Sequence, residues 1–221
     1  MTSDPSGSNP YRLMLNYAIL IDGGFAKRKL NGKQPATAEH FKKLIQTLSA
    51  MSPLDEMRLH RVYYYDSVPL ETSHDNPISQ DTIDFGRSSQ ATRIKSLYEH
   101  LTSVPYMALR LGELAFRGWN IPAKVLRKAQ DGQVTITAED LVPQISQKGV
   151  DMRIGMDIAA LTLKKQVDVI VLVTGDSDFV PAMKFARREG AVLFLVTLGH
   201  RVKPVMIEHS DLQLDVALPL N

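Results

Sequence analysis

The feature that most constrains this sequence is a set of short, strongly apolar runs that each stop at acidic residues or glycine. Residues 169–173 are Val-Ile-Val-Leu-Val and end at Thr-Gly-Asp-Ser-Asp, and residues 17–21 are Tyr-Ala-Ile-Leu-Ile and end at Asp-Gly-Gly. Strands that are apolar on both faces are buried between two layers, which is the usual environment of a parallel sheet. These runs therefore predict an α/β fold.

Helical patterns alternate with these strands. Apolar residues recur at helical spacing in three segments, 41–48, 89–101 and 154–161, and a fourth helix is expected at 179–188. Further strands are expected at 61–65, 107–112 and 191–198, with a long loop at 69–88. Alternation of strands and helices predicts a Rossmann-like, three-layer α/β sandwich around a mostly parallel central sheet.

The length of 221 residues favours one domain with an insertion, since domains average ~150 residues. Residues 1–13 are mostly polar and predict a disordered leader, so the domain is expected to span 14–221. Within it, residues 118–147 contain Asp131-Gly132, a dipeptide typical of hairpin turns. This stretch predicts an inserted hairpin or arm.

Composition excludes several classes of protein. The chain has no cysteine, which excludes disulfides, thiolate catalysis and zinc bound by cysteine. No window approaches ~18 uninterrupted apolar residues and no signal-peptide pattern is present, so we expect a cytoplasmic protein with no membrane contact. A net charge of +2 excludes a strongly basic histone-like binder, and no glycine-rich nucleotide motif occurs. Formation of a homo-oligomer stays open.

Four aspartates are placed where a sheet of this kind binds ligands, beyond the carboxyl ends of its strands. Asp22 follows the first strand, Asp176 and Asp178 follow the strand at 169–173, and Asp151 begins the helix before that strand. Taken singly, Asp22 is explained as a turn residue and Asp151 as a helix N-cap. The pair Asp176 and Asp178 is harder to explain, because neighbouring like charges repel unless something neutralises them.

A divalent cation would neutralise this cluster. Carboxylates without cysteine or paired histidine favour Mg²⁺ or Mn²⁺ over zinc, and such an ion activates water and stabilises the leaving oxygen of a phosphodiester. The predicted chemistry is metal-dependent hydrolysis of a phosphate ester. Asp157 lies six residues beyond Asp151, which separates their side chains by ~120° around a helix. Asp157 is therefore either a second-tier acid of the site or a helix partner for Lys or Arg.

Three segments together resemble the NYN domain, a PIN-like nuclease family, and in particular its LabA-like bacterial branch: 17–25, Lys148-Gly149-Val150-Asp151 and 174–179. The resemblance extends over about residues 16–199. It implies a ribonuclease with a Mg²⁺ or Mn²⁺ site formed by Asp22, Asp151, Asp176 and Asp178, with an acid often present at Asp157. One departure is Phe25, which stands where the family usually has asparagine.

An RNA substrate requires cations along the path of its phosphates. The candidates are the basic residues next to the acidic motifs and around the polar loop: Lys27, Arg28, Lys29, Lys148, Arg87 and Arg93. Each could equally be an ordinary solvated charge. Two other functions are weighed. A haloacid-dehalogenase-like phosphatase would need a second aspartate where the chain has Gly24, whereas a non-catalytic regulator that binds RNA or protein would be compatible with Phe25.

Overall fold

The computed structural model describes residues 14–127 and 130–219, so the predicted leader at 1–13 lies outside the described residues. Its centre is a seven-stranded sheet of order β6-β5-β2-β1-β7-β8-β9. The strands are β1 (Asn16–Asp22), β2 (Arg58–Ser67), β5 (Met107–Asn120), β6 (Val142–Lys148), β7 (Val169–Val173), β8 (Val192–Val196) and β9 (Leu212–Gln213). All neighbouring strands are parallel except β5 and β6. The predicted α/β class and mostly parallel sheet are therefore confirmed.

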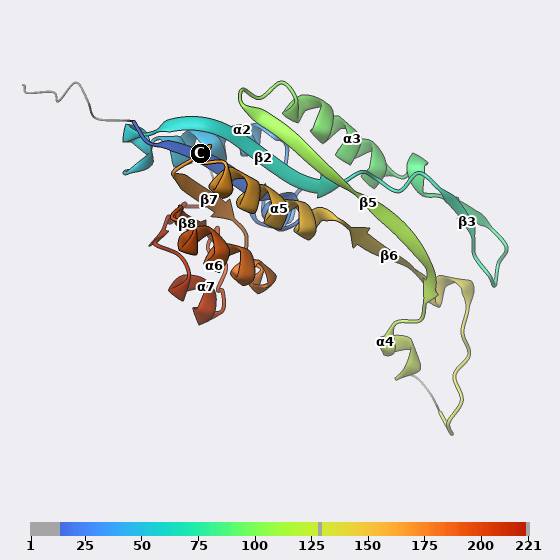
Figure 1. Cartoon of the computed structure of the whole chain (residues 1–221). Coiled ribbons are helices and arrows are strands. Elements are labelled where there is room, and N and C mark those ends of the chain that lie inside the picture. Colours follow the sequence, from blue (N-terminus) through green and yellow to red (C-terminus); the bar gives the residue numbers. More distant parts are fainter. Residues whose placement is uncertain (1–13, 128–129, 220–221) are drawn as a thin grey trace, which may run out of the picture.

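Both faces of the sheet are covered around its central strands β1 and β7, as the apolar strands predict (Figure 1). In β1, Tyr17, Ile19 and Ile21 belong to one core, whereas Ala18 and Leu20 belong to the other. The first core is shared with α1 (Gly23–Lys29), α2 (Ala38–Ser49) and α3 (Ser89–Leu101). The second core is shared with α5 (Val150–Leu163), α6 (Val180–Arg188) and α7 (Pro204–Glu208). Within the described ranges, no helix is long and apolar enough to cross a membrane.

The order of the strands reverses direction at β1. The chain passes from β1 to β2 on one side, and β7 later joins β1 on the other side, with Ile21 paired to Val173. A crevice opens at such a switch point because the following segments leave toward opposite faces of the sheet. The ends of β1 and β7, which carry Asp22 and Thr174, are therefore neighbours across this point.

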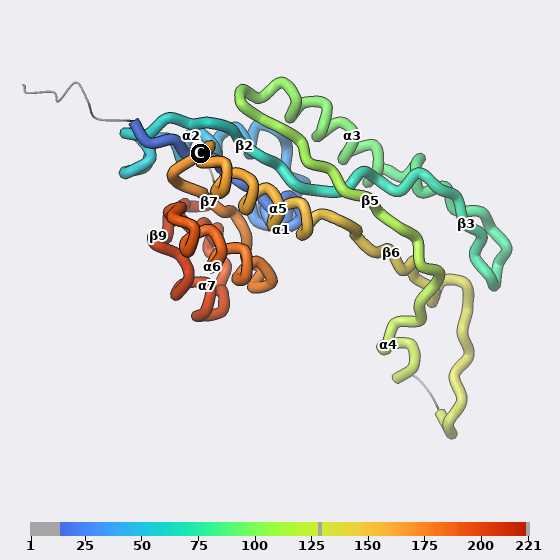
Figure 2. Tube along the Cα trace, in the orientation of Figure 1, coloured from blue at the N-terminus to red at the C-terminus, as the bar shows by residue number. Residues whose placement is uncertain are grey.

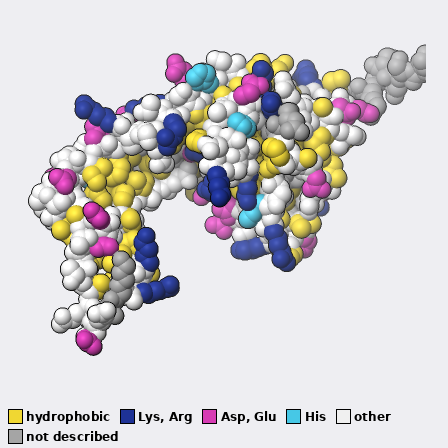
Figure 3. Space-filling view, turned by 180° about the vertical axis from the view of Figure 1, so that it is seen from behind, with side chains coloured by type: hydrophobic (Ala, Val, Ile, Leu, Met, Phe, Trp, Pro, Cys, Tyr) yellow, Lys and Arg dark blue, Asp and Glu magenta, His cyan; other side chains and the backbone are white. Residues whose placement is uncertain are grey.

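An arm projects from the sheet beyond β2 (Figures 1 and 2). β5 pairs with β2 only as far as Gly112, and its second half pairs with β6 alone. The arm also carries the hairpin of β3 (Ser73–Asp75) and β4 (Thr82–Asp84), and the short helix α4 (Ala123–Leu126). Phe116 stacks on His74 with ring centroids 3.8 Å apart, and the Trp119 indole donates to the carbonyl of Asp75 at 3.0 Å. Hydrophobic side chains gather on this part of the surface (Figure 3).

The structure departs from the sequence analysis at several elements. The expected loop at 69–88 contains the β3–β4 hairpin and a 3-10 turn, η2 (Phe85–Arg87), and β5 continues eight residues past its expected end at 112. At Asp131-Gly132 a turn forms, closed by two hydrogen bonds of 2.9 Å between Gln130 and Gln133. Val125 and Leu126, expected in the first strand of a hairpin, belong to α4. Three further 3-10 turns are η1 (Leu54–Glu56), η3 (Ala138–Asp140) and η4 (Ser177–Phe179).

Candidate functional site

Asp22 ends β1 and caps α1, a helix that the sequence analysis did not predict. Its Oδ1 accepts the Phe25 backbone N–H at 3.0 Å, which is the usual contact of an N-cap, and its Oδ2 accepts the Thr174 hydroxyl at 3.0 Å. Burial raises the pKa of the Asp22 carboxyl, although both hydrogen bonds and the charge of Arg28 act to lower that pKa. The carboxylate is thus held in place at the switch point, and its charge is only partly compensated there.

Thr174 joins the end of β7 to the end of β1. Its hydroxyl donates to Asp22 and accepts the backbone N–H of Asp176 at 3.1 Å. Asp176 in turn caps η4, because its Oδ1 accepts the backbone N–H of Asp178 at 2.9 Å. One chain of hydrogen bonds therefore fixes the turn that carries both acids, and both side chains remain exposed.

Asp151 lies in the first turn of α5. The N-cap there is Gly149, with φ of 77°, so the N-cap alternative weighed for Asp151 is wrong. Burial raises the pKa of Asp151 most, followed by the negative charges of Asp176 and Asp178. The charge of Asp151 in turn raises the pKa of Asp22. The four predicted acids therefore belong to one electrostatic cluster.

The cluster is looser than a closed metal cage. Within the described residues, no three Asp, Glu, His or Cys side chains lie close enough together to bind one ion directly. Asp22 and Asp176 line the same cavity, whose volume is about 380 Å³. Mg²⁺ commonly binds through one or two carboxylates and keeps several waters, so this donor set is compatible with a hydrated ion.

The hydrogen-bond partners of Asp157 are residues outside this cluster. Its two oxygens accept from the Arg110 guanidinium at 2.8 and 2.6 Å, and Oδ2 also accepts the Tyr65 hydroxyl at 2.9 Å. Burial and the negative charge of Asp157 raise the pKa of Tyr65, so this hydroxyl stays protonated as a donor. These contacts match the second alternative given for Asp157, a residue on a helix that pairs with an arginine.

The cavity has a second, cationic wall. It comprises Arg28 from α1 and three residues of the loop after β8: His200, Arg201 and Lys203. Two contacts hold this loop against the acidic side. Lys203 Nζ donates to Ser177 Oγ at 2.9 Å, and Lys29 Nζ lies 3.3 Å from His200 Nδ1. Acids and cations therefore face one small volume.

The sequence analysis missed His200, Arg201 and Lys203. They follow a buried strand whose carboxyl end opens at the same edge of the sheet as β1 and β7, and this position was the available signal. The residues between β8 and Arg201 are a tight turn, with φ of 48° at Leu198 and 69° at Gly199. This turn carries the loop back toward Gly175.

Phe25 also lines the cavity, between its acidic and its cationic wall. It is buried, its ring centroid lies 5.8 Å from that of His200, and a side chain at Gly175 would meet both rings at 2.6 Å. The aromatic ring therefore has a packing role where the resembling family has a polar side chain. It also explains why position 175 is glycine.

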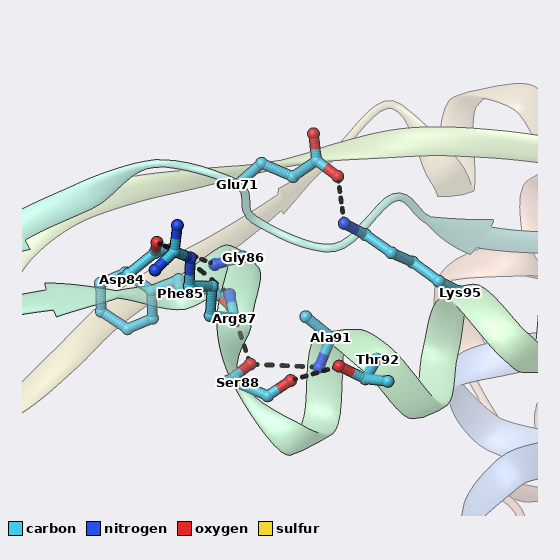
Figure 4. A network of polar contacts seen from close by, with 9 residues as sticks. All are labelled: Glu71, Asp84, Phe85, Gly86, Arg87, Ser88, Ala91, Thr92 and Lys95. Carbon is cyan, nitrogen blue, oxygen red and sulfur yellow. Dashed lines mark hydrogen bonds and ion pairs between the residues drawn. The ribbon is translucent and has the colours of Figure 1, made fainter.

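The other predicted cations have varied surroundings. Lys27 forms an ion pair of 2.5 Å with Asp66, whose side chain is only 7% exposed. Arg87 pairs with Asp84 at 3.3 Å beside the start of α3 (Figure 4), and Arg93 lines a separate cavity between α2 and α3. Lys148 ends β6, next to the start of α5, and is exposed. Of the six predicted cations, Arg28 alone lines the cavity of the acids.

Comparison with known families matches the NYN domain to residues 113–211. The matched segment contains Asp151, Asp176 and Asp178 and ends before β9. This match supports a relationship to the NYN family, whose members are generally nuclease-like. Asp22 and the strands β1 and β2 lie outside the matched segment. No curated protein matches the sequence.

Among solved structures, one similar chain is a protein of unknown function from Vibrio parahaemolyticus. The two share 12% identity with a TM-score of 0.56, and the alignment covers 94% of this chain and 96% of that one. At this identity the likeness shows the fold alone. A maltogenic alpha-amylase from Thermotoga neapolitana aligns at 11% identity over 91% of this chain and 49% of that one, but its TM-score of 0.25 carries no argument.

Proposed function

We propose that this protein is a metal-dependent ribonuclease of the PIN-like, LabA-like branch of the NYN family. The observation that carries the proposal is the electrostatic cluster of Asp22, Asp151, Asp176 and Asp178 at the switch point of the sheet. Asp22 and Asp151 have raised pKa values, and carboxylates with perturbed pKa values gather at functional sites. The NYN match over three of these acids supports the same reaction class.

Mg²⁺ or Mn²⁺ is the proposed cofactor. Asp22 and Asp176 would hold it, since both line the cavity, and Asp151 and Asp178 would complete the site through water. When bound, the ion supplies activation of water and charge stabilisation at a phosphodiester. Asp22 is oriented by its hydrogen bonds from Phe25 and Thr174 before any ligand arrives. This preorganisation means that little rearrangement is needed at the moment of reaction.

The raised pKa of Asp151 suits a second role. A carboxyl group whose pKa lies above its ordinary value holds a proton more readily near neutral pH than an unperturbed aspartate does. Asp151 is exposed at the helix start and is therefore open to solvent and substrate. We assign to the Asp151 carboxylate the role of general base, which accepts a proton from the attacking water.

A second candidate is a regulator that binds RNA without cutting it. One observation favours it: Phe25 is buried against Gly175 and His200, and an aromatic ring offers no hydrogen bond to a phosphate or to water. The presence of all four acids favours the nuclease.

The deciding experiment incubates purified protein with single-stranded and structured RNAs, with Mn²⁺ or with EDTA. We expect cleavage only with the metal, and a loss of orders of magnitude for Asp178→Asn with RNA affinity equal or higher, because a repulsive charge is removed. The matched control is Asp55→Asn, which removes an exposed carboxylate in η1, outside the cavity. Binding of RNA without any Mn²⁺-dependent cleavage would establish the regulator instead.

A further inference from the structure

Apart from the charge of Arg28, which lowers the pKa of Asp22, the cationic wall of the cavity has no part in the proposed carboxylate chemistry. Arg28, Arg201 and Lys203 line the same volume as Asp22 and Asp176. In the described part of the chain, none of the three cations forms an ion pair with a carboxylate. Most other cations considered for RNA binding either have an acidic partner, as Lys27 has Asp66, or lie outside this cavity. Three positive side chains thus face the cavity of Asp22 and Asp176 without forming an ion pair there.

We propose that Arg28, Arg201 and Lys203 form a subsite for one phosphate group of the RNA, beside the phosphate that is cut. This inference rests on the proposed ribonuclease function and adds the position at which the protein holds the RNA. Arginine suits the task because its planar fork donates two parallel hydrogen bonds to phosphate oxygens, and lysine adds a third charge. A cavity of about 380 Å³ is within the size range of pockets for small ligands.

The side chains of Arg28, Arg201 and Lys203 are exposed, but the turn that leads to Arg201 and Lys203 is fixed by packing. The turn at Leu198 and Gly199 has positive φ at both residues, and Leu198 is 3% exposed. A non-glycine residue in this conformation is costly and persists only where the surroundings hold it. The turn directs the loop so that His200 contacts Phe25 and the backbone of Gly175. The position of Arg201 therefore depends on packed neighbours.

Lys203 links the subsite to the acids. Its Nζ hydrogen-bonds Ser177, which stands between Asp176 and Asp178 in the chain. A phosphate held by Lys203 and Arg201 would consequently lie next to the turn that carries Asp176 and Asp178. The ligand is a phosphate of RNA from either of two sources, an internal phosphodiester or a terminal phosphate.

The test measures binding of a short fluorescent single-stranded RNA by anisotropy in EDTA, over a series of salt concentrations, so that cleavage plays no part. Arg201→Gln with Lys203→Gln should weaken binding about tenfold and reduce the slope of log affinity against log salt by about 0.7, the value for one phosphate contact on a single strand. The matched control is Lys164→Gln with Lys165→Gln, which removes the same charge beyond the end of α5, outside the cavity. The control should change binding less than twofold.

Two further arms separate the alternatives. Ser177→Ala removes the hydrogen bond to Lys203 without changing charge. If this variant loses as much RNA affinity as the Arg201 and Lys203 variant, the structure of the turn and not a phosphate contact explains the loss, and the proposal is overturned. RNAs of one sequence with a 5′-hydroxyl or a 5′-phosphate distinguish the sources: a loss confined to the phosphorylated strand identifies a terminal phosphate, and an equal loss identifies an internal one.

The failures of the two proposals differ. If wild type cuts RNA with Mn²⁺ but the Arg201 and Lys203 variant binds as the control does, the subsite is wrong and the ribonuclease stands. If wild type binds and the variant loses binding but no RNA is cut, the subsite stands and serves a binding protein. If wild type binds no RNA at all, both proposals are refuted.

Discussion

Truncation of Asp157 to alanine tests whether this residue is a structural partner or an acid of the site. The substitution removes the acceptor of the Tyr65 hydroxyl, and Tyr65 is 0% exposed. Leaving a buried donor unpaired costs about 1–3 kcal/mol. The Arg110 ion pair adds less, about 0.2–1 kcal/mol, because the Arg110 side chain is 45% exposed and can turn to water.

We therefore expect Asp157→Ala to lower the free energy of unfolding by about 2–3 kcal/mol, equivalent to roughly 5–10 °C in Tm for a domain of this size. Thermal and urea unfolding would measure the loss. The rise of Tm on adding Mn²⁺ should be the same as in wild type, because Asp157 has no contact with the cavity.

A double-mutant cycle with Tyr65→Phe isolates the hydroxyl contact. Once the hydroxyl is absent, loss of Asp157 leaves no buried donor unpaired, so the double variant should be more stable than the sum of the single effects predicts, by about 1–2 kcal/mol. Additive losses would refute the role of the hydrogen bond. A variant that melts like wild type but no longer responds to Mn²⁺ would place Asp157 among the acids of the site.

Three further substitutions probe the surroundings of the site. Asp151→Asn should raise Tm at pH 7 without metal, because the raised pKa of Asp151 means that the folded protein loses stability as pH rises through that pKa. The gain in Tm should therefore shrink toward pH 4.5. Equal gains at both pH values would contradict the assignment. Gly175→Ala should cost about 1–3 kcal/mol, seen in urea unfolding, since the new methyl group meets Phe25 and His200 at 2.6 Å, and an unchanged midpoint would show that the loop is loosely held. Lys27→Ala should cost up to about 3 kcal/mol by removing the cation that pairs with the buried Asp66 carboxylate, which keeps its hydrogen bonds from Tyr64 and Ser67. Adding Asp66→Asn should recover part of this loss, and no recovery would argue against the pair.

The strands and most helices of the core could be predicted from sequence because burial on both faces leaves a local signature. The run at 169–173 is such a case, and β7 has the same bounds. The second half of β5 carries Glu113 and Arg117 among apolar residues, and nothing local shows that it continues into an arm paired with β6. The helix α1 was missed because its first turn depends on a cap, Asp22, that also ends the strand.

The acids of the candidate site were accessible to sequence reasoning, whereas their partners were not. Asp176 and Asp178 lie two residues apart in a motif that follows a buried strand. Arg110 is 47 residues from Asp157, and Arg201 reaches the cavity through a turn whose backbone conformation is set by packing at Leu198. Contacts of this kind arise from tertiary structure; the position of Arg201 after a buried strand indicates the edge of the sheet at which it lies, but not its contacts there.

The two walls of the cavity are held in different ways, and this decides which substitutions are informative. Asp22 and Asp176 each accept a backbone N–H through Oδ1, a contact that the amide oxygen of asparagine preserves. Asparagine at Asp176 therefore removes charge while keeping the turn, whereas asparagine at Asp22 also removes the acceptor of the Thr174 hydroxyl. On the cationic wall, Lys203 is held by a side-chain contact to Ser177, so glutamine at this position removes charge and contact together. Loss of charge on the acidic wall should consequently appear as lost turnover in a folded protein, whereas loss on the cationic wall should appear first as weaker binding of RNA.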